Sequence, residues 1–203
     1  MKKYLEISTM SLAAKNTLAA FRYFSSKTPD ALWNLANYRF LLPVQSRWQD
    51  NDAYGHINYA IYYTYGGLMT TKFINQHCKG NHVGQFTVYS NCTNRSSLRY
   101  PEIPLAGLAS TKIGKSSIEL NIGLFRPKVG DKDPTFATGL SLNGSFSEDL
   151  DMTNIYANYE DNAVAVVHTT QVFVDKQTER PIPLGKTAVK SFEKILIPQN
   201  TVA

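Results

Sequence analysis

The chain has 203 residues, of which 43% are hydrophobic and 18% are charged, and its formal net charge is +5. That length supports one domain with a full core and is short for two domains of ordinary size. No run of apolar residues approaches the roughly 18 that a membrane-spanning helix needs, so we expect no membrane span.

The positive charge is concentrated at the amino terminus. Residues 1–27 carry five basic side chains and one acidic one: Lys2, Lys3, Lys15, Arg22 and Lys27 against Glu6. The remaining chain is therefore nearly neutral. Because a protein that binds nucleic-acid phosphates needs a basic face, this distribution argues against nucleic acid as a partner.

The same segment has the features of an import signal. On a helical wheel two basic residues, Lys15 and Arg22, share one side, while Ala14, Leu18 and Phe21 share another. Acidic residues are almost absent, and residues 21–26 resemble a matrix-processing site. Residues 1–27 are therefore predicted to be a mitochondrial transit peptide, which places the protein in the matrix. The alternative is a cytoplasmic protein whose amino-terminal helix docks or stays disordered.

The next part of the chain predicts one strand and one long helix. Residues 28–37 have the composition of a linker or short helix, and Tyr38 to Trp48 alternates like a strand. Asn58 to about Cys78 predicts the helix, because apolar residues recur at three- and four-residue spacing: Ile61, Tyr62, Tyr65, Leu68, Met69 and Phe73. The pair Gly66-Gly67 is expected to allow close approach of a sheet, or to kink the helix.

Beyond residue 85 the pattern changes to strands. They are expected at Phe86–Cys92, Arg95–Tyr100, Leu105–Ile113, Ser116–Phe125 and Ala163–Val174. Residues 127–162 are expected to be an acidic surface insertion with a strand near Phe136 to Leu142, and residues 191–203 a carboxy-terminal tail. One buried helix followed by antiparallel strands predicts an α+β domain over residues 38–190.

The most informative stretch joins the predicted first strand to the helix. It has the sequence R-W-Q-D-N-D-A-Y-G-H-I-N-Y and runs from Arg47 to Tyr59. Two carboxylates, an imidazole and an amide thus lie where a helix begins and its first backbone N–H groups are free. Such N–H groups can polarise a carbonyl oxygen, so this junction is the candidate active site.

This motif resembles the signature of hotdog-fold acyl-CoA thioesterases of the 4-hydroxybenzoyl-CoA thioesterase-like family. Segments 82–100, 107–117 and 172–184 extend the resemblance, which covers roughly residues 38–186. It implies a curved antiparallel sheet wrapped around one long central helix, and hydrolysis of an acyl-CoA to free acid and CoA. It also implies that CoA enters only as part of the substrate, without another cofactor. A homodimer or homotetramer is implied as well, with the acyl site between subunits.

The resemblance assigns roles in the motif. Asp52 matches the family's second aspartate, which acts as nucleophile or general base, and His56 and Asn58 would shape the turn and hold Asp52 or the attacking water. Backbone amides around Tyr54, Gly55 and Tyr59 would bind the oxyanion or the substrate. A second possibility is that Asp52 only caps the turn. Tyr59 stands where many relatives have asparagine, and Gly66-Gly67 where many carry an aromatic residue and an acid, so no helix-borne carboxylate remains.

For CoA, the resemblance points to Lys115 and Ser116, and Lys112 is a further candidate because it lies close by and the ligand's phosphates call for basic side chains. A solvated turn without a ligand is the other interpretation of these residues. The apolar run Val164 to Val167 would allow subunit pairing if it lay near a sheet edge.

Other chemistries are not supported by the sequence. Residues 50–55 begin like a calcium-binding EF-hand loop, but Ile61 stands where the bidentate glutamate is required. No G-x-S-x-G occurs, and Cys78 and Cys92 have no partners at metal-ligand spacing, so neither a serine triad nor a metal site is expected. Two alternatives remain: a hotdog protein without hydrolysis, acting as an acyl-binding or structural subunit of a mitochondrial assembly, and, more weakly, a hydratase or dehydratase.

Overall fold

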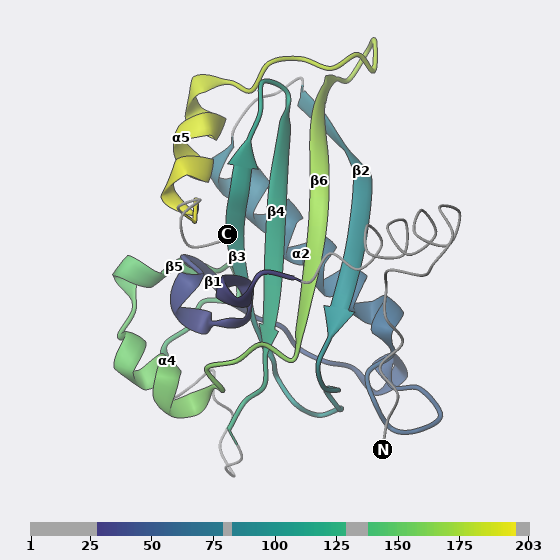
Figure 1. The fold of residues 1–203 in the computed structure, drawn as a ribbon, viewed down its shortest axis with the longest axis vertical. Coiled ribbons are helices and arrows are strands. Elements are labelled where there is room, and N and C mark those ends of the chain that lie inside the picture. Colours follow the sequence, from purple (N-terminus) through teal and green to yellow (C-terminus); the bar gives the residue numbers. More distant parts are fainter. Residues whose placement is uncertain (1–27, 79–82, 129–137, 198–203) are drawn as a thin grey trace, which may run out of the picture.

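Six antiparallel strands form one curved sheet in the order β2-β6-β4-β3-β1-β5 (Figure 1). This computed structural model describes residues 28–78, 83–128 and 138–197, so the predicted transit peptide lies outside the described residues. The strands are β1 Phe40–Pro43, β2 Val83–Asn94, β3 Leu105–Ile113, β4 Ser117–Phe125, β5 Ser145–Phe146 and β6 Ala165–Asp175. The α-helices are α2 Tyr59–His77, α4 Met152–Asn158 and α5 Lys186–Lys194.

Helix α2 lies across one face of the sheet, and its bounds confirm the helix predicted from apolar spacing. Asn58 caps its start, because the side-chain Oδ1 accepts a hydrogen bond from the Ala60 N–H at 2.9 Å. The helix ends at Cys78, whose N–H donates to the Ile74 carbonyl. Its sheet-facing side is buried and consists of Tyr62, Tyr65, Gly66, Met69, Thr70 and Phe73.

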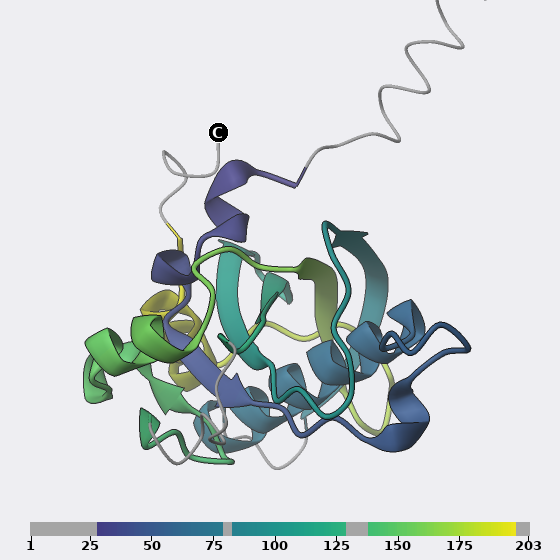
Figure 2. The same ribbon diagram turned by 90° about the horizontal axis from the view of Figure 1, so that it is seen from below.

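Apolar cores fill both faces of the sheet. The larger core lies between α2 and the sheet and includes Phe40, Met69, Leu120 and Phe192. On the opposite face, two 3-10 helices, η2 Asp30–Trp33 and η3 Leu35–Asn37, pack with α4 over a second core (Figure 2). Residues 28–37, expected as a linker or short helix, are therefore a packed part of the domain. Of the expected tail, the stretch to Ile197 packs as well, since Ile197 is buried and its N–H donates to Ser110.

The predicted strand at Arg95–Tyr100 is wrong. The N–H groups of Arg95 and Ser96 both donate to the Val164 carbonyl, and the Leu98 N–H donates to the Tyr62 hydroxyl. These partners turn the chain away from the sheet. The first strand is also shorter than predicted, since only Phe40–Pro43 pairs with β3. In contrast, β3 has the predicted bounds, and β2, β4 and β6 differ from prediction by one to three residues at their ends.

The insertion differs from its prediction. Residues 138–142 do not form a strand, and 129–137 lie outside the described residues. Instead β5 pairs with β1 and so extends the sheet on that side. Two of the acidic residues pair with basic side chains of the domain, Glu148 with Lys194 and Glu160 with Arg126, each at 3.8 Å. The insertion is thus fastened to the domain by strand pairing and ion pairs.

The run Val164 to Val167 does not lie at a sheet edge. Its strand residues belong to β6, which pairs with β2 on one side and β4 on the other. The edge beside it is β2, whose residues 86–90 are all exposed. Cys78 and Cys92 are free, partly buried thiols, and burial raises the pKa of Cys78 to about 12.

The two adjacent glycines of α2 have different surroundings. A Cβ at Gly66 would come within 3.3 Å of Val167 Cγ1 on β6, whereas a Cβ at Gly67 would meet no atom within 4 Å. The predicted close approach to the sheet is therefore confirmed for Gly66 only.

This difference gives a matched pair of variants. Gly67→Ala should raise the free energy of unfolding by about 0.5–1 kcal/mol, because alanine loses less backbone entropy in a helix. Gly66→Ala has the same backbone advantage but must displace Val167, so it should stabilise less or destabilise. Urea unfolding of both variants measures the difference, and equal effects would contradict the packing described.

Candidate active site

The motif predicted as the active site forms a short turn at the start of α2. Trp48–Asp50 make a 3-10 helix, and an isolated bridge between Asn51 and Ile57 closes the loop that follows. Across this loop the Asp52 N–H donates to the His56 carbonyl at 2.7 Å. The Ile57 N–H donates to Leu98 at 2.8 Å, so the turn is also fixed to a neighbouring segment.

Asp50 anchors this turn from inside the protein. Its carboxylate is fully buried, with Oδ1 accepting from the Arg47 guanidinium at 2.9 and 3.1 Å. Oδ2 accepts from the Arg47 N–H at 2.9 Å and from the Tyr65 hydroxyl at 2.8 Å. Burial alone would raise the pKa of Asp50, but these hydrogen bonds together outweigh it and leave the pKa lowered. Burial and the neighbouring carboxylate raise the pKa of Tyr65.

Asp52 has one oxygen engaged by the turn and one that is not. Oδ1 accepts from the N–H groups of Tyr54 at 2.8 Å and His56 at 3.1 Å, which is a turn-capping arrangement. Among the described residues, Oδ2 has no hydrogen-bond partner. The side chain is half-buried and helps to line an open pocket of about 520 Å³. Asp52 therefore caps the turn and also presents a carboxylate oxygen beside a pocket.

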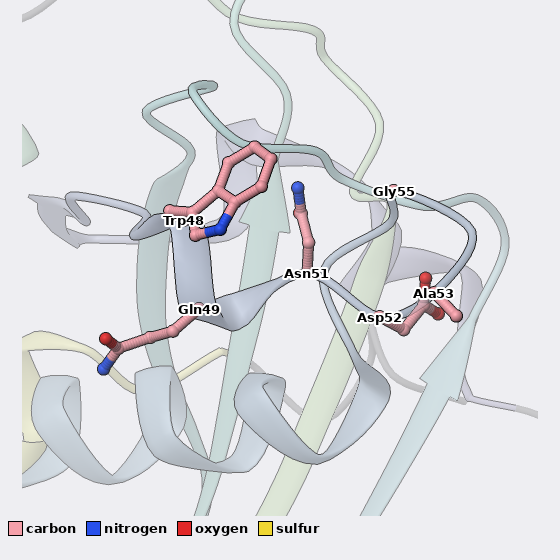
Figure 3. Close-up of a pocket in the computed structure, with 6 residues that line it drawn as sticks. All are labelled: Trp48, Gln49, Asn51, Asp52, Ala53 and Gly55. Carbon is pink, nitrogen blue, oxygen red and sulfur yellow. The ribbon is translucent and has the colours of Figure 1, made fainter.

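The pocket is lined by the turn itself: Trp48, Gln49, Asn51, Asp52, Ala53 and Gly55. In Figure 3 the Asn51 side chain extends toward the Trp48 ring, while the Asp52 carboxylate turns toward Ala53. Trp48 is 77% exposed, and its ring meets Tyr100 edge-on at 6.1 Å between centroids. Apart from Asp52, the lining carries no charged side chain, so it suits a neutral group better than a phosphate.

Most backbone amides expected to bind an oxyanion are already occupied. The Tyr54 N–H donates to the Asp52 side chain and the Gly55 N–H to the Asp52 carbonyl. Within the described stretch 54–61, the Tyr59 N–H is the one backbone donor without an acceptor. Tyr59 is the first residue of α2, so this free N–H lies at the positive end of the helix dipole.

The other two predicted catalytic residues have structural contacts. The Asn58 side chain caps α2, and its own N–H donates to the Asp50 carbonyl at 2.8 Å. His56 Nε2 lies 3.1 Å from an Arg99 guanidinium nitrogen. Because a guanidinium only donates, Nε2 accepts this bond, and the neutral ring carries its proton on Nδ1. Neither side chain has a hydrogen bond to the Asp52 carboxylate.

Sequence reasoning missed that the segment Leu98–Tyr100 contacts the turn of the candidate site. Besides the Arg99 contact, the Tyr100 N–H donates to Asn51 Oδ1 at 3.2 Å. Arg99 is exposed and lies beside the acidic turn. The sequence predicts this segment as a strand, because no local sequence pattern distinguishes an edge strand from a segment that packs beside a site. The anchoring role of Tyr65 was missed for a similar reason, because its spacing marks it only as a buried helix residue.

The predicted CoA-binding residues lie at the opposite end of the sheet. Lys115 and Ser116 form the turn between β3 and β4, whereas residues 95–98 beside the site lie near the far end of β4. At about 3.4 Å per residue, the length of β4 separates the two places by roughly 25 Å. Lys112 is paired with Glu119 at 3.4 Å. A single protomer therefore does not bring Lys112, Lys115 and Ser116 to Asp52.

The described residues contain neither a metal-ligand cluster nor a membrane-spanning helix. Across residues 28–78, 83–128 and 138–197, no three His, Cys, Asp or Glu side chains gather in a way that could hold a metal ion. No helix of this described part combines the length and apolarity needed to cross a bilayer.

The contrast between the two aspartates can be tested through stability. Asp50→Asn should lower the free energy of unfolding by about 1.5–3 kcal/mol at neutral pH, because it removes charge-assisted hydrogen bonds from a buried site. Asp52→Asn should cost less, since an amide oxygen can still accept from Tyr54 and His56. The pKa of Asp50 is lowered on folding, so its stabilisation should be complete above the ordinary aspartate pKa of about 3.9 and be lost as the pH falls below it. Urea unfolding of both variants between pH 3 and 7 measures this; an Asp52 variant as unstable as the Asp50 variant would contradict the assignment.

Comparisons with known proteins identify the fold. No protein-family model and no curated protein matches this sequence. Among solved structures, the PA5185 protein from Pseudomonas aeruginosa is similar, with a TM-score of 0.61 and 20% identity over 79% of this chain and 94% of that one. A thioesterase from Thermus thermophilus complexed with coenzyme A and Zn has a TM-score of 0.53 and 14% identity, over 76% and 98% of the two chains. The DHNA-CoA thioesterase from Staphylococcus aureus has a TM-score of 0.52 and 13% identity, over 76% and 87%.

What the chain shares with these structures at such low identity is the fold. The antiparallel sheet with a helix across one face is arranged as in those structures. The turn that contains Asp52 lies at the start of that helix. The described residues therefore have the α+β, hotdog-type fold found in thioesterases.

Proposed function

We propose that this protein is an acyl-CoA thioesterase of the 4-hydroxybenzoyl-CoA thioesterase-like branch, with α2 as the central helix. The observation that carries the proposal is the Asp52 carboxylate oxygen beside an open pocket, at the turn that leads into α2. The likeness to thioesterases, one of them with coenzyme A bound, supports the choice of substrate.

The chemistry would use two groups of the turn. Asp52 Oδ2 either attacks the thioester carbonyl or removes a proton from the attacking water. The carbonyl oxygen becomes an oxyanion, and the free Tyr59 N–H at the helix start stabilises it. Collapse of the tetrahedral intermediate breaks the C–S bond and releases CoA. When Asp52 attacks first, water then hydrolyses the acyl-enzyme anhydride; in both routes the products are the free acid and CoA.

Asp52→Asn tests the proposal directly. A well-placed general base contributes about 10²- to 10⁴-fold to rate, so kcat on the acyl-CoA that is turned over best should fall at least 100-fold. Fold and oligomeric state should be retained, which circular dichroism and gel filtration check. Asp149→Asn, at an exposed acid of the insertion, is the matched control and should leave kcat unchanged. Unchanged turnover in Asp52→Asn would remove this residue from the mechanism.

An acyl-binding or structural subunit without hydrolysis remains the second candidate, and the capping bonds of Asp52 Oδ1 are the observation that favours it. Co-purification with a large assembly at fixed stoichiometry, together with no activity on short, long or aryl acyl-CoAs, would support that role.

For both candidates we propose a location in the mitochondrial matrix, because residues 1–27 resemble a transit peptide. Fusion of this segment to a fluorescent protein would test import.

A homodimer is part of the proposal, and the uncovered edge of the sheet supports it. Among the described residues, strand β2 pairs only with β6, and it exposes Phe86, Val88 and Tyr89. A long exposed apolar edge invites pairing with another strand. A two-fold axis through paired β2 edges reverses the strand direction in the partner. The partner's Lys115 would then lie at the same end of the assembly as Asp52, so the CoA site would be completed between subunits.

Val88→Lys tests this interface, because a charge on an edge strand opposes pairing. The unmodified protein should be a dimer or a larger even-numbered assembly by analytical ultracentrifugation, and the variant should shift toward monomer. Leu142→Lys, at an exposed apolar residue of the insertion, should have no such effect. A monomeric parent protein, or a Val88 variant that keeps its oligomeric state, would exclude the β2 interface.

A further inference from the structure

The layer between α2 and the sheet has an unusual polar stretch. Side chains between a helix and the sheet that it covers are normally apolar. Here the sides of α2 and of two strands carry a set of polar residues that we call the polar seam: Thr70, Gln85, Thr87, Thr169 and Gln171. On the neighbouring strand β4, Leu120 pairs with Thr169 and Ile118 with Gln171, and both are apolar. At these positions the polar residues therefore lie on β6 and β2 and not on β4.

Part of the seam has no hydrogen-bond partner. Gln171 and Thr87 bond to each other, with Nε2 to Oγ1 at 2.9 Å. In contrast, the hydroxyl oxygens of Thr70 and Thr169 and the Oε1 of Gln85 are buried and have no partner among the described residues. Thr70 and Thr169 are themselves only 3% and 7% exposed. Buried polar groups are nearly always satisfied, so these three atoms point to a missing hydrogen-bonding group.

The two threonines lie near one contact between α2 and β6. Gly66 lies over Val167, as its 3.3 Å approach shows. One helical turn further along α2 is Thr70, and two residues further along β6, on the same face, is Thr169. These steps are roughly 6 Å and 7 Å, so each threonine lies one short step beyond the contact between Gly66 and Val167.

The seam is open to the surface at the free edge of the sheet. On β2, Thr87 and Ser90 belong to the helix-facing side, because they pair with Gln171 and Thr169, yet both are exposed. At Gly67 a Cβ would meet nothing within 4 Å, so the helix adds no bulk there. From Tyr59, whose N–H is free, Thr70 lies eleven residues along α2, or about 16 Å.

We infer that the polar seam binds a hydroxyl or carbonyl group of the acyl chain, so that the enzyme prefers oxygenated acyl groups over plain alkyl ones. The inference rests on the proposed function, which places the thioester beside Tyr59. An acyl chain extending along the β2 side of α2 would carry its distal oxygen to the two threonines. A hydroxyl or carbonyl group of the chain can accept a hydrogen bond from a threonine hydroxyl, which satisfies that side chain.

Binding of thioether analogues, which cannot be hydrolysed, tests the inference separately from catalysis. The probes are S-dodecyl-CoA and its ω-hydroxy counterpart, measured by calorimetry on the full chain. The parent protein should bind the hydroxylated probe about tenfold more tightly. Thr70→Val and Thr169→Val, which keep the shape and remove the hydroxyl, should each bring that ratio toward one. Thr71→Val, an exposed neighbour on α2, should leave it unchanged.

A ratio near one in the parent protein, an unchanged ratio in both seam variants, or no binding of either probe would overturn the inference. If the ratio behaves as expected while no acyl-CoA is hydrolysed, the proposed catalysis fails and the seam stands as an acyl-binding site. Thermal unfolding of the variants checks that they fold.

Discussion

The candidate site depends on one buried carboxylate. Asp50 has no contact with solvent, so its charge is tolerated only because four hydrogen bonds from Arg47 and Tyr65 surround it. These bonds join the turn before α2 to the second turn of the helix itself. The loop that follows can then be short, and Asp52, the second aspartate of the motif, lies at the surface. Two acids of one motif thus have opposite environments, one sealed and structural, the other beside a pocket.

Several groups near the β2 edge of the sheet have no bonding partner in the described structure. No described residue pairs with the Tyr59 N–H at the start of α2, with the outer edge of β2, or with the hydroxyls of Thr70 and Thr169. The side of α2 away from Thr70 carries Tyr65, Lys72 and Gln76, which bond to the turn before the helix and to the insertion. One side of α2 is therefore committed to the fold, and the other has polar and apolar groups available for binding.

Local patterns predicted much of this fold. The apolar spacing of α2 and its Asn58 cap are local signals, and so is the alternation of β3, so their bounds were close to those expected. The strand predicted at Arg95–Tyr100 failed because its backbone partners, Val164 and Tyr62, lie far away in the sequence. The motif indicated where the site lies, but not which of its amides would be free. The folded loop between Asn51 and Ile57 is needed to show that the N–H groups of Tyr54 and Gly55 both donate to Asp52.

The insertion determines which edge of the sheet can pair with a strand of another molecule. By adding β5 outside β1, the insertion leaves on that side an edge of two residues, which is too short to pair with another strand. On the other side, no described residue covers the twelve residues of β2. A sheet with a single usable edge can grow by strand addition only once, since the second copy uses up its own edge in the same contact. Such growth closes as a symmetric pair and cannot propagate into a filament.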